Sequence, residues 1–244
     1  MAMATINPAT GETEFEAELH TPAEVEARLA KAQEAHEKLR TMTYAERAKL
    51  MLVAADLIES EVEKTAVMLT REMGKPIAQS RGEVLKCAKN MRFYAEKSEE
   101  FLAPQVLADP SLVGASQAMA IWQPLGVVLA VMPWNYPLWQ VIRFAAPALM
   151  AGNSGVLKHA SNVPQSALYL DDLFTRAGFP EGSFSTLMIS ASQVAPVIDD
   201  WRVRAVTLTG SEPAGRAVAA QAGSQIKPSV MELGGSDAFV VTPN

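Results

Sequence analysis

The sequence predicts an α/β protein in which a parallel sheet with helices on both faces follows an all-helical N-terminal region. Charge divides the chain: residues 1–103 carry 32 of the 48 charged side chains, which is typical of exposed amphipathic helices. Residues 104–244 instead alternate short apolar, β-branched runs with segments of helical spacing. Continuous apolar runs between helices are typical of parallel strands that are buried on both faces.

The composition excludes several classes of protein. With 244 residues, 49% hydrophobic and 20% charged, the chain is long enough for one large domain or two small ones. A net charge of −6 gives no basic face for nucleic acid, and no apolar run approaches the roughly 18 residues of a membrane span. The opening residues lack the pattern of a signal peptide, so we expect a cytoplasmic protein. The single cysteine, Cys87, excludes an internal disulfide, and the three scattered histidines predict no metal site.

Three helices are predicted in the charged front part. Their start signals are capping boxes or a proline, and they are expected from Thr21 to about Arg40, Thr43 to about Met73 and Pro76 to about Phe101. Cys87 lies in the third helix, where we expect a small, semi-buried side chain rather than a nucleophile.

The back part is predicted element by element. Strands are expected at Gly126–Met132, Gly155–Lys158, Ser185–Ile189, Val203–Leu208, Ser229–Glu232 and Ala238–Val241. Helices are expected at Pro137–Met150, Pro164–Ala177, a segment ending near Asp199, and Pro213–Ala222. Before them, residues 104–123 have few charges and alternate in Ala118–Trp122, which predicts an exposed strand pair outside the main sheet.

Ligands of parallel sheets bind at the carboxyl ends of the strands, so the residues there are candidates. Gly210 and Ser211 follow one strand and precede a helix that Pro213 opens, and free amides at a helix N-terminus bind phosphate or pyrophosphate. An ordinary turn between strand and helix explains the same spacing equally well. The segment matches neither the G-x-G-x-x-G fingerprint nor the P-loop.

Two other strand ends carry polar side chains. Pro133 and Pro137 fix a loop in which Asn135 could donate to a developing oxyanion, although a rigid loop with Trp134 as a packing anchor is the alternative. Lys158 ends a buried strand and suits ribose hydroxyls or a phosphate. We expect its neighbour His159 at the solvent edge, where it could assist a phosphate when protonated.

Glu232 lies in an apolar run just before Gly234 and Gly235, which predicts a general base with a raised pKa. Structural pairing of this glutamate to a neighbour is the alternative. No second carboxylate accompanies it, so a glycosidase is not supported, and the serine-hydrolase motif G-x-S-x-G is absent from the sequence.

These segments, in this order, resemble the aldehyde dehydrogenase superfamily. The similar motifs are Pro133-Trp134-Asn135, Lys158-His159-Ala160-Ser161, Gly210-Ser211 and Glu232-Leu233-Gly234-Gly235, together with Asn7–Glu12 and Glu72–Pro76. Runs such as Phe144–Gly152 look most like bacterial succinate-semialdehyde dehydrogenases. The resemblance implies a Rossmann-like cofactor domain, NADP (with NAD as the alternative), a small aldehyde substrate and a homo-oligomer. It also implies that Trp134, Lys158, Ser161, Gly210, Ser211 and Leu233 contact the cofactor, with Asn135 as the oxyanion donor and Glu232 as the base.

Arg143 matches the arginine that meets the distal carboxylate of semialdehyde substrates in that family. Independently, it follows Asn135 by eight residues, about two helical turns, in an otherwise apolar helix. A lone guanidinium in apolar surroundings is suited to bind a carboxylate, and pairing to a backbone carbonyl or another carboxylate is the alternative.

The sequence departs from the family's pattern in its catalytic cysteine. The resemblance expects that cysteine a few tens of residues after Gly235, whereas the sequence stops at Asn244 and Cys87 precedes the motif. We therefore expect a helical part at residues 1–103, an oligomerisation arm at 104–123, a dinucleotide-binding core at 124–230 and the start of a catalytic domain at 231–244. Serine replaces the usual Glu at Ser161 and the usual Lys at Ser236. An inactive dinucleotide-binding module and an interaction protein are the alternatives to an enzyme.

Overall fold

Five parallel strands form one sheet within residues 3–242, the part of the chain that the computed structural model describes. The strand order is β7-β6-β5-β8-β9, and the strands are β5 (Val127–Met132), β6 (Ser154–His159), β7 (Phe184–Thr186), β8 (Val203–Gly210) and β9 (Ser229–Leu233). The chain runs outward from β5 to β7 and then returns to the other side of β5 as β8. This reversal creates a switch point between β5 and β8, where ligands of such sheets bind.

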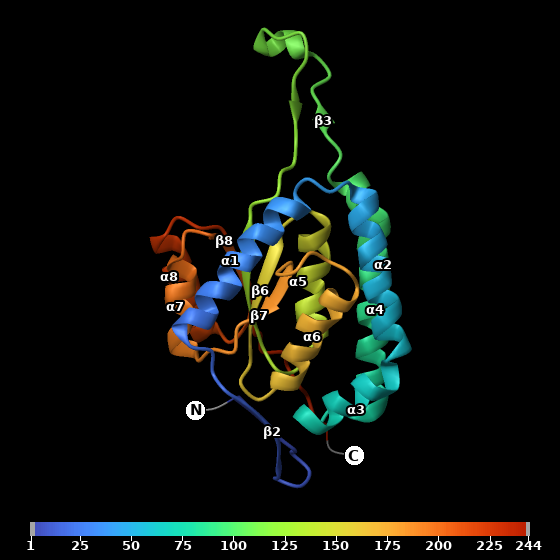
Figure 1. The fold of residues 1–244 in the computed structure, drawn as a ribbon, viewed down its shortest axis with the longest axis vertical. Coiled ribbons are helices and arrows are strands. Elements are labelled where there is room, and N and C mark those ends of the chain that lie inside the picture. The colour runs from blue at the N-terminus through green and yellow to red at the C-terminus, as the bar shows by residue number, and fades with distance from the viewer. Residues whose placement is uncertain (1–2, 243–244) are drawn as a thin grey trace.

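Helices cover both faces of the sheet, as predicted. Side chains alternate along β5: Val127 and Leu129 belong to one core cluster, Ala130 and Met132 to the other. The first face packs against α1 (Pro22–Leu39), α7 (Val194–Asp199) and α8 (Glu212–Ser224). The second packs against α5 (Trp139–Met150) and α6 (Pro164–Arg176), with α2 (Tyr44–Ser60) and α4 (Ile77–Phe101) on the outer side of α5 (Figure 1).

The N-terminal region is mostly helical, but two predictions about it were wrong. The capping boxes of Thr21 and Thr43 start α1 and α2 as expected. The predicted helix to Met73, however, divides at Glu61 into α2 and α3 (Val62–Met73), because the Glu61 backbone departs from helical geometry, with φ −100° and ψ 16°. In addition, β1 (Met3–Ile6) and β2 (Thr13–Ala17) form a hairpin where no strand was predicted. Both strands are short, with four and five residues, and β1 shows no alternation of apolar and polar residues.

The predicted strand pair outside the sheet is confirmed. β3 (Gln105–Val106) pairs antiparallel with β4 (Met119–Ala120), and a short 3₁₀ helix, Pro110–Val113, forms the tip. Figure 1 shows this arm projecting from the body of the molecule, at the opposite end from the β1–β2 hairpin. Its apolar side chains, including those of Leu112 and Trp122, are exposed.

The predicted strand at Ala238–Val241 is wrong. Residues 234–242 adopt no regular structure in the part of the chain described, and Phe239 is 92% exposed. Apolar, β-branched residues favour a strand only where a neighbouring strand and a core are present, and here neither lies beside them. Among the described helices, none is long and apolar enough to cross a membrane.

Candidate functional site

A cavity of about 400 Å³ lies at the switch point of the sheet. It is bounded by the loop after β5, the ends of β8 and β9, and the first turns of α5. Seven of the nine predicted site residues line it: Trp134, Asn135, Arg143, Gly210, Ser211, Glu232 and Leu233. Segments separated by about 100 residues in the sequence therefore meet in one site, where the rule for parallel sheets places it.

The two faces of the sheet divide the candidates into two groups. Glu232 is in register with Thr209, and both side chains point toward α5 and Arg143. Leu233, one residue further, packs on α8 at the opposite face. Lys158 follows Val156, which belongs to the core under α1, α7 and α8, by two residues, so it also points to that face. The predicted acid–base and substrate residues thus lie on the α5 face, and most predicted cofactor residues lie on the α8 face.

The N-terminus of α8 is suited to an anion. Ser211 is the N-cap residue, and within residues 3–242 its side chain makes no capping hydrogen bond, so the first amides of α8 remain available to a ligand. Gly215 lets this helix approach β9 closely, because a Cβ atom there would lie 2.5 Å from Leu233 Cδ2. The helix start and the end of β9 therefore form one wall of the cavity.

Lys158 and Ser161 lie outside the lining of this cavity, at the end of the next strand, β6. Lys158 is in register with Val131 of β5 and is half-buried, and burial lowers the pKa of its ammonium group. Ser161 is exposed in the loop between β6 and α6, and its carbonyl accepts a hydrogen bond from the Ala4 amide at 3.0 Å. A ligand bound at the start of α8 would have to extend along the carboxyl edge of the sheet to reach Lys158 and Ser161.

His159 is buried, and its predicted place at the solvent edge was wrong. β6 continues one residue beyond the predicted end, and the imidazole turns beneath the loop between Pro133 and Pro137. Its Nδ1 accepts from the Ala160 amide at 2.9 Å, so Nε2 carries the proton and donates to the Pro137 carbonyl at 2.9 Å. Burial lowers its pKa to about 4, which rules out a charged imidazole for binding phosphate near neutral pH.

The alternative role of Trp134 as a packing anchor was also wrong. Its side chain is 50% exposed and lines the cavity, as does Asn135, which is exposed too. The loop is anchored from beneath by His159 instead. Both residues are therefore accessible to a ligand, as a cofactor contact and an oxyanion donor must be.

Arg143 and Glu232, predicted separately, lie beside each other. Arg143 Nη2 donates to Thr209 Oγ1 at 3.0 Å, and Nη1 lies 3.8 Å from Glu232 Oε2. The side chains are 37% and 58% exposed, so the apolar surroundings predicted for each are wrong. The long distance and the exposure make this a weak ion pair, one that a substrate carboxylate could displace.

Gln140 and Thr209 also line the cavity and were missed from the sequence. Gln140 precedes Arg143 by three residues on α5, which places both on one helix face, and this spacing was an available signal. Within the described chain, Gln140 Oε1 is buried and has no hydrogen-bond partner. Thr209 carried no such signal, because its partner Arg143 is 66 residues away.

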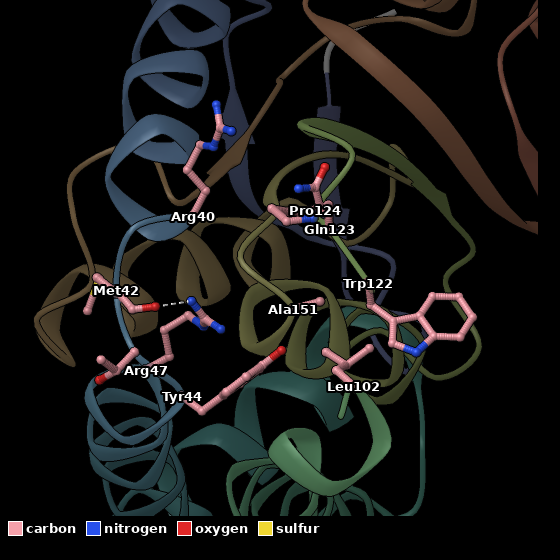
Figure 2. Close-up of a pocket in the computed structure, with 10 residues that line it drawn as sticks. Arg40, Met42, Tyr44, Arg47, Leu102, Trp122, Gln123, Pro124 and Ala151 are labelled. Atoms are coloured by element: carbon pink, nitrogen blue, oxygen red, sulfur yellow. Dashed lines mark hydrogen bonds between the residues drawn. The ribbon is translucent and has the colours of Figure 1, made fainter. Parts of the chain in front are cut away.

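Other polar groups in the molecule have structural roles. A second pocket, shown in Figure 2, surrounds the guanidinium of Arg47. Arg47 donates to the carbonyls of Leu39, Met42 and Met150, at the ends of α1 and α5, and lies over the Tyr44 ring. It joins the two helix ends, and we assign this pocket no ligand. Cys87 is fully buried rather than semi-buried, and burial raises the pKa of its thiol, so the reactive thiolate form is disfavoured. No cluster of metal-ligating side chains occurs among residues 3–242.

Comparison with known proteins identifies close relatives. The chain is 57% identical over 244 residues to an NADP-dependent succinate-semialdehyde dehydrogenase of Mycobacterium leprae, and 56% identical to one of Mycobacterium tuberculosis. Both matches cover 100% of this chain and 53% of the relative, so the chain spans about half the length of the curated relatives it matches.

Solved structures agree with this relationship. The chain is similar to the crystal structure of succinic semialdehyde dehydrogenase from Streptococcus pyogenes in complex with NADP⁺, with a TM-score of 0.93 and 38% identity over 98% of this chain and 52% of the other. The enzyme of the same kind from Burkholderia pseudomallei gives a TM-score of 0.91 and 31% identity over 99% of this chain and 50% of the other. A model of the aldehyde dehydrogenase family matches residues 1–244, and the chain therefore belongs to that family.

Proposed function

We propose that this chain is the cofactor-binding half of an NADP-dependent aldehyde dehydrogenase that oxidises succinate semialdehyde to the acid. The observation that carries the proposal is the convergence of Asn135, Arg143, Glu232 and the start of α8 on one cavity at the switch point. An anion site, an amide donor, a cation and a carboxylate are the groups that this reaction needs around one substrate.

The residues present fit a dinucleotide. The start of α8 would hold the pyrophosphate, because its N-cap residue, Ser211, lines the cavity and makes no side-chain cap to the first amides. Lys158 and Ser161 would hold the ribose end, with Trp134 and Leu233 against the flat rings. NADP, when bound, would accept a hydride from the substrate. We favour NADP over NAD because a serine at position 161 leaves room for a 2′-phosphate, whereas a glutamate there would repel it.

On the α5 face, the chain's own side chains would act on the aldehyde. Asn135 would donate its side-chain amide to the carbonyl oxygen as negative charge develops there. Glu232 would take the proton of the water that releases the acid, and its exposure gives water access to it. Arg143 would meet the distal carboxylate, since its partners within the described residues, Thr209 and Glu232, leave guanidinium donors available.

The reaction also needs a thiolate, and Cys87 cannot supply it. Its sulfur is buried and Cys87 is not among the residues that line the cavity, so the proposed nucleophile lies outside these 244 residues. The same observation favours the second candidate, a dinucleotide-binding module without chemistry. The two functions differ in the full-length protein: only the enzyme reduces NADP when succinate semialdehyde is added.

The arm formed by β3 and β4 supports a proposal about assembly. Val106, Leu112, Met119, Ile121 and Trp122 expose apolar surface on this projection, whose strands β3 and β4 pair with each other. We propose that this surface is covered in a homo-oligomer. Light scattering should then show dimers or larger species at micromolar protein, and a clean monomer would contradict the assignment.

The function is tested with calorimetry and kinetics on the full-length protein. We expect NADP to bind more tightly than NAD, and succinate semialdehyde to be oxidised more efficiently than butanal, an uncharged aldehyde of similar length. Replacement of Asn135 by Ala should lower kcat by about 10²–10³, the usual effect of removing an oxyanion donor. Binding of NADP without any aldehyde oxidation would support the non-catalytic module instead.

A further inference from the structure

The corner between α3 and α4, residues 72–83, buries three charged side chains that the proposed function does not use. Glu72, Lys75 and Glu83 are 2%, 5% and 3% exposed. Burying a charge is costly unless hydrogen bonds or an opposite charge compensate for it, so their partners indicate what they stabilise.

Glu83 caps a helix that begins 55 residues later in the sequence. Its Oε1 accepts from the backbone amides of Leu138 at 2.9 Å and Trp139 at 3.0 Å, the N-cap residue and first residue of α5. Leucine has no side-chain acceptor for these amides, so the cap comes from α4 instead. The other carboxylate oxygen, Oε2, pairs with Lys75, whose Nζ lies 3.5 Å from the centroid of the Tyr136 ring. The pair therefore holds the chain on the carboxyl side of Asn135.

Glu72 does the same for α6. Its Oε1 accepts from the Gln165 amide at 2.7 Å, and its Oε2 accepts from the Ser166 amide at 3.0 Å and from the Ser166 hydroxyl. The N-cap residue of α6 is Val163, which again has no side-chain acceptor. Glu72 also accepts from Thr5 Oγ1 at 2.9 Å, and the adjacent residue, Ala4, donates its amide to the Ser161 carbonyl at 3.0 Å. Burial raises the pKa of this carboxyl group.

The two capped helices follow two of the strands that end at the proposed site. α5 follows β5 and the Asn135 loop, and α6 follows β6 and the Ser161 loop. We propose that Glu83 with Lys75 is the positioning device for Asn135, and that Glu72 is the positioning residue for Ser161. The roles of Asn135 and Ser161 rest on the proposed function, whereas the capping contacts do not.

The negative charge of each carboxylate is the property to test. An ionised acceptor at a helix N-terminus is favoured by the helix dipole as well as by its hydrogen bonds. Glutamine keeps the size and one acceptor oxygen but loses the charge, so each cap should weaken without leaving a cavity. Glu63, which pairs with Arg81 on the exposed side of α3, offers a matched Glu→Gln control.

The first experiment is independent of catalysis and measures amide hydrogen exchange in the full-length protein. Glu83→Gln should speed exchange at Leu138 and Trp139 by about tenfold or more, as expected for the loss of a charge-assisted bond, and leave Gln165 and Ser166 unchanged. Glu72→Gln should give the converse pattern, and Glu63→Gln should change neither pair. The proposal would be overturned if either variant sped exchange equally at both pairs of amides, or if it left exchange at both pairs unchanged. Should Glu83→Gln not fold, Glu83→Asp keeps the charge and should affect the same two amides.

The second experiment separates positioning from general stability. Glu83→Gln should lower kcat by about tenfold, with the Kd for NADP within about twofold of wild type. Glu72→Gln should raise the Kd for NADP by about fivefold and lower kcat less. In an Asn135→Ala background, Glu83→Gln should have almost no further effect on kcat, since the group it positions is gone. Fully additive losses would overturn the proposal. A wild-type protein without dehydrogenase activity would instead overturn the proposed function, and the exchange pattern would still decide the capping roles.

Discussion

The two sides of the candidate site differ in how firmly their residues are held. On the β5–β6 side, the loops that carry Asn135 and Ser161 rest on buried groups from other parts of the chain, namely Glu83, Glu72 and His159. On the β8–β9 side, Glu232 and Leu233 are exposed, and the contact from Arg143 to Glu232 is long. On the β5–β6 side, the buried carboxylates of Glu83 and Glu72 thus hold the start of the helix that follows each loop.

The open side also includes an apolar groove. A groove of about 530 Å³ runs along the α5 face of β8 and β9, and Val128, Phe144, Ala205 and Val230 are among its lining residues. Parallel sheets are ordinarily covered on both faces, and α5 and α6 cover only β5, β6 and β7 here within residues 3–242. The β5–β6 side of the site is therefore packed within this chain, whereas the β8–β9 side presents sheet surface that no described helix covers.

The largest expected effect concerns the nucleophile, which neither side provides. The 244-residue chain alone should produce no NADPH from succinate semialdehyde, because the Cys87 thiol is buried and its pKa is raised. A spectrophotometric assay at high protein concentration checks this, with Cys87→Ser as the control. Steady NADPH production that survives Cys87→Ser would mean that one side of the site carries an unrecognised nucleophile.

The next largest effect concerns His159, which anchors the loop on the β5–β6 side, and it is measured as the pH dependence of the free energy of unfolding. The folded-state pKa of His159 is about 4, below the unfolded value of 6.5, so the unfolded chain takes up the proton first. The stability that this group contributes is present above pH 6.5 and is lost as the pH falls toward 4, amounting to about 3 kcal/mol.

Urea unfolding of wild type and His159→Gln at several pH values measures this contribution. The variant should lack it, so the difference in the free energy of unfolding between the two proteins should shrink as the pH falls from 6.5 to 4. A difference that stays constant with pH would show that His159 does not hold its loop as a buried neutral imidazole.

A comparable effect concerns Arg143, which faces the open side. If the full-length protein has the proposed activity, Arg143→Leu should raise its KM for succinate semialdehyde by about 10- to 150-fold, the range for losing a charge-assisted hydrogen bond. The KM for butanal should change little, because it has no carboxylate to bind. Equal losses on both substrates would make Arg143 a structural partner of Thr209 and Glu232.

The smallest expected effect concerns cofactor choice at the β6 loop. Ser161→Glu should shift the ratio of NADP to NAD affinity toward NAD by at least about tenfold, or 1.4 kcal/mol, because a carboxylate would repel the 2′-phosphate. Calorimetry with both cofactors measures the ratio. Ser161→Ala serves as the control, since it removes the hydroxyl without adding charge, and a glutamate variant with the wild-type ratio would contradict the assignment.

Local patterns were sufficient to predict most of the fold. The capping boxes at Thr21 and Thr43, the strand–helix alternation after residue 124 and the strand pair in the arm are all present. The same patterns failed at Glu61, where the backbone departs from helical geometry, and at Ala238–Val241, where no strand lies alongside within the described residues. Helical and strand spacing report the preferences of a segment, and distant partners can override them.

The sequence by itself also determined which side chains meet at the site. Asn135, Gly210, Ser211, Glu232 and Leu233 all follow or end strands of the predicted parallel sheet, and parallel strands bring their carboxyl ends to one edge. Only the tertiary structure decided what those side chains contact. The pairing of Arg143 with Glu232, the burial of His159 and the caps from Glu72 and Glu83 all join residues 22 to 94 positions apart. Such contacts leave no periodic signal in a single chain, since hydrogen-bond partners are chosen by proximity in space after the helices have packed on the sheet.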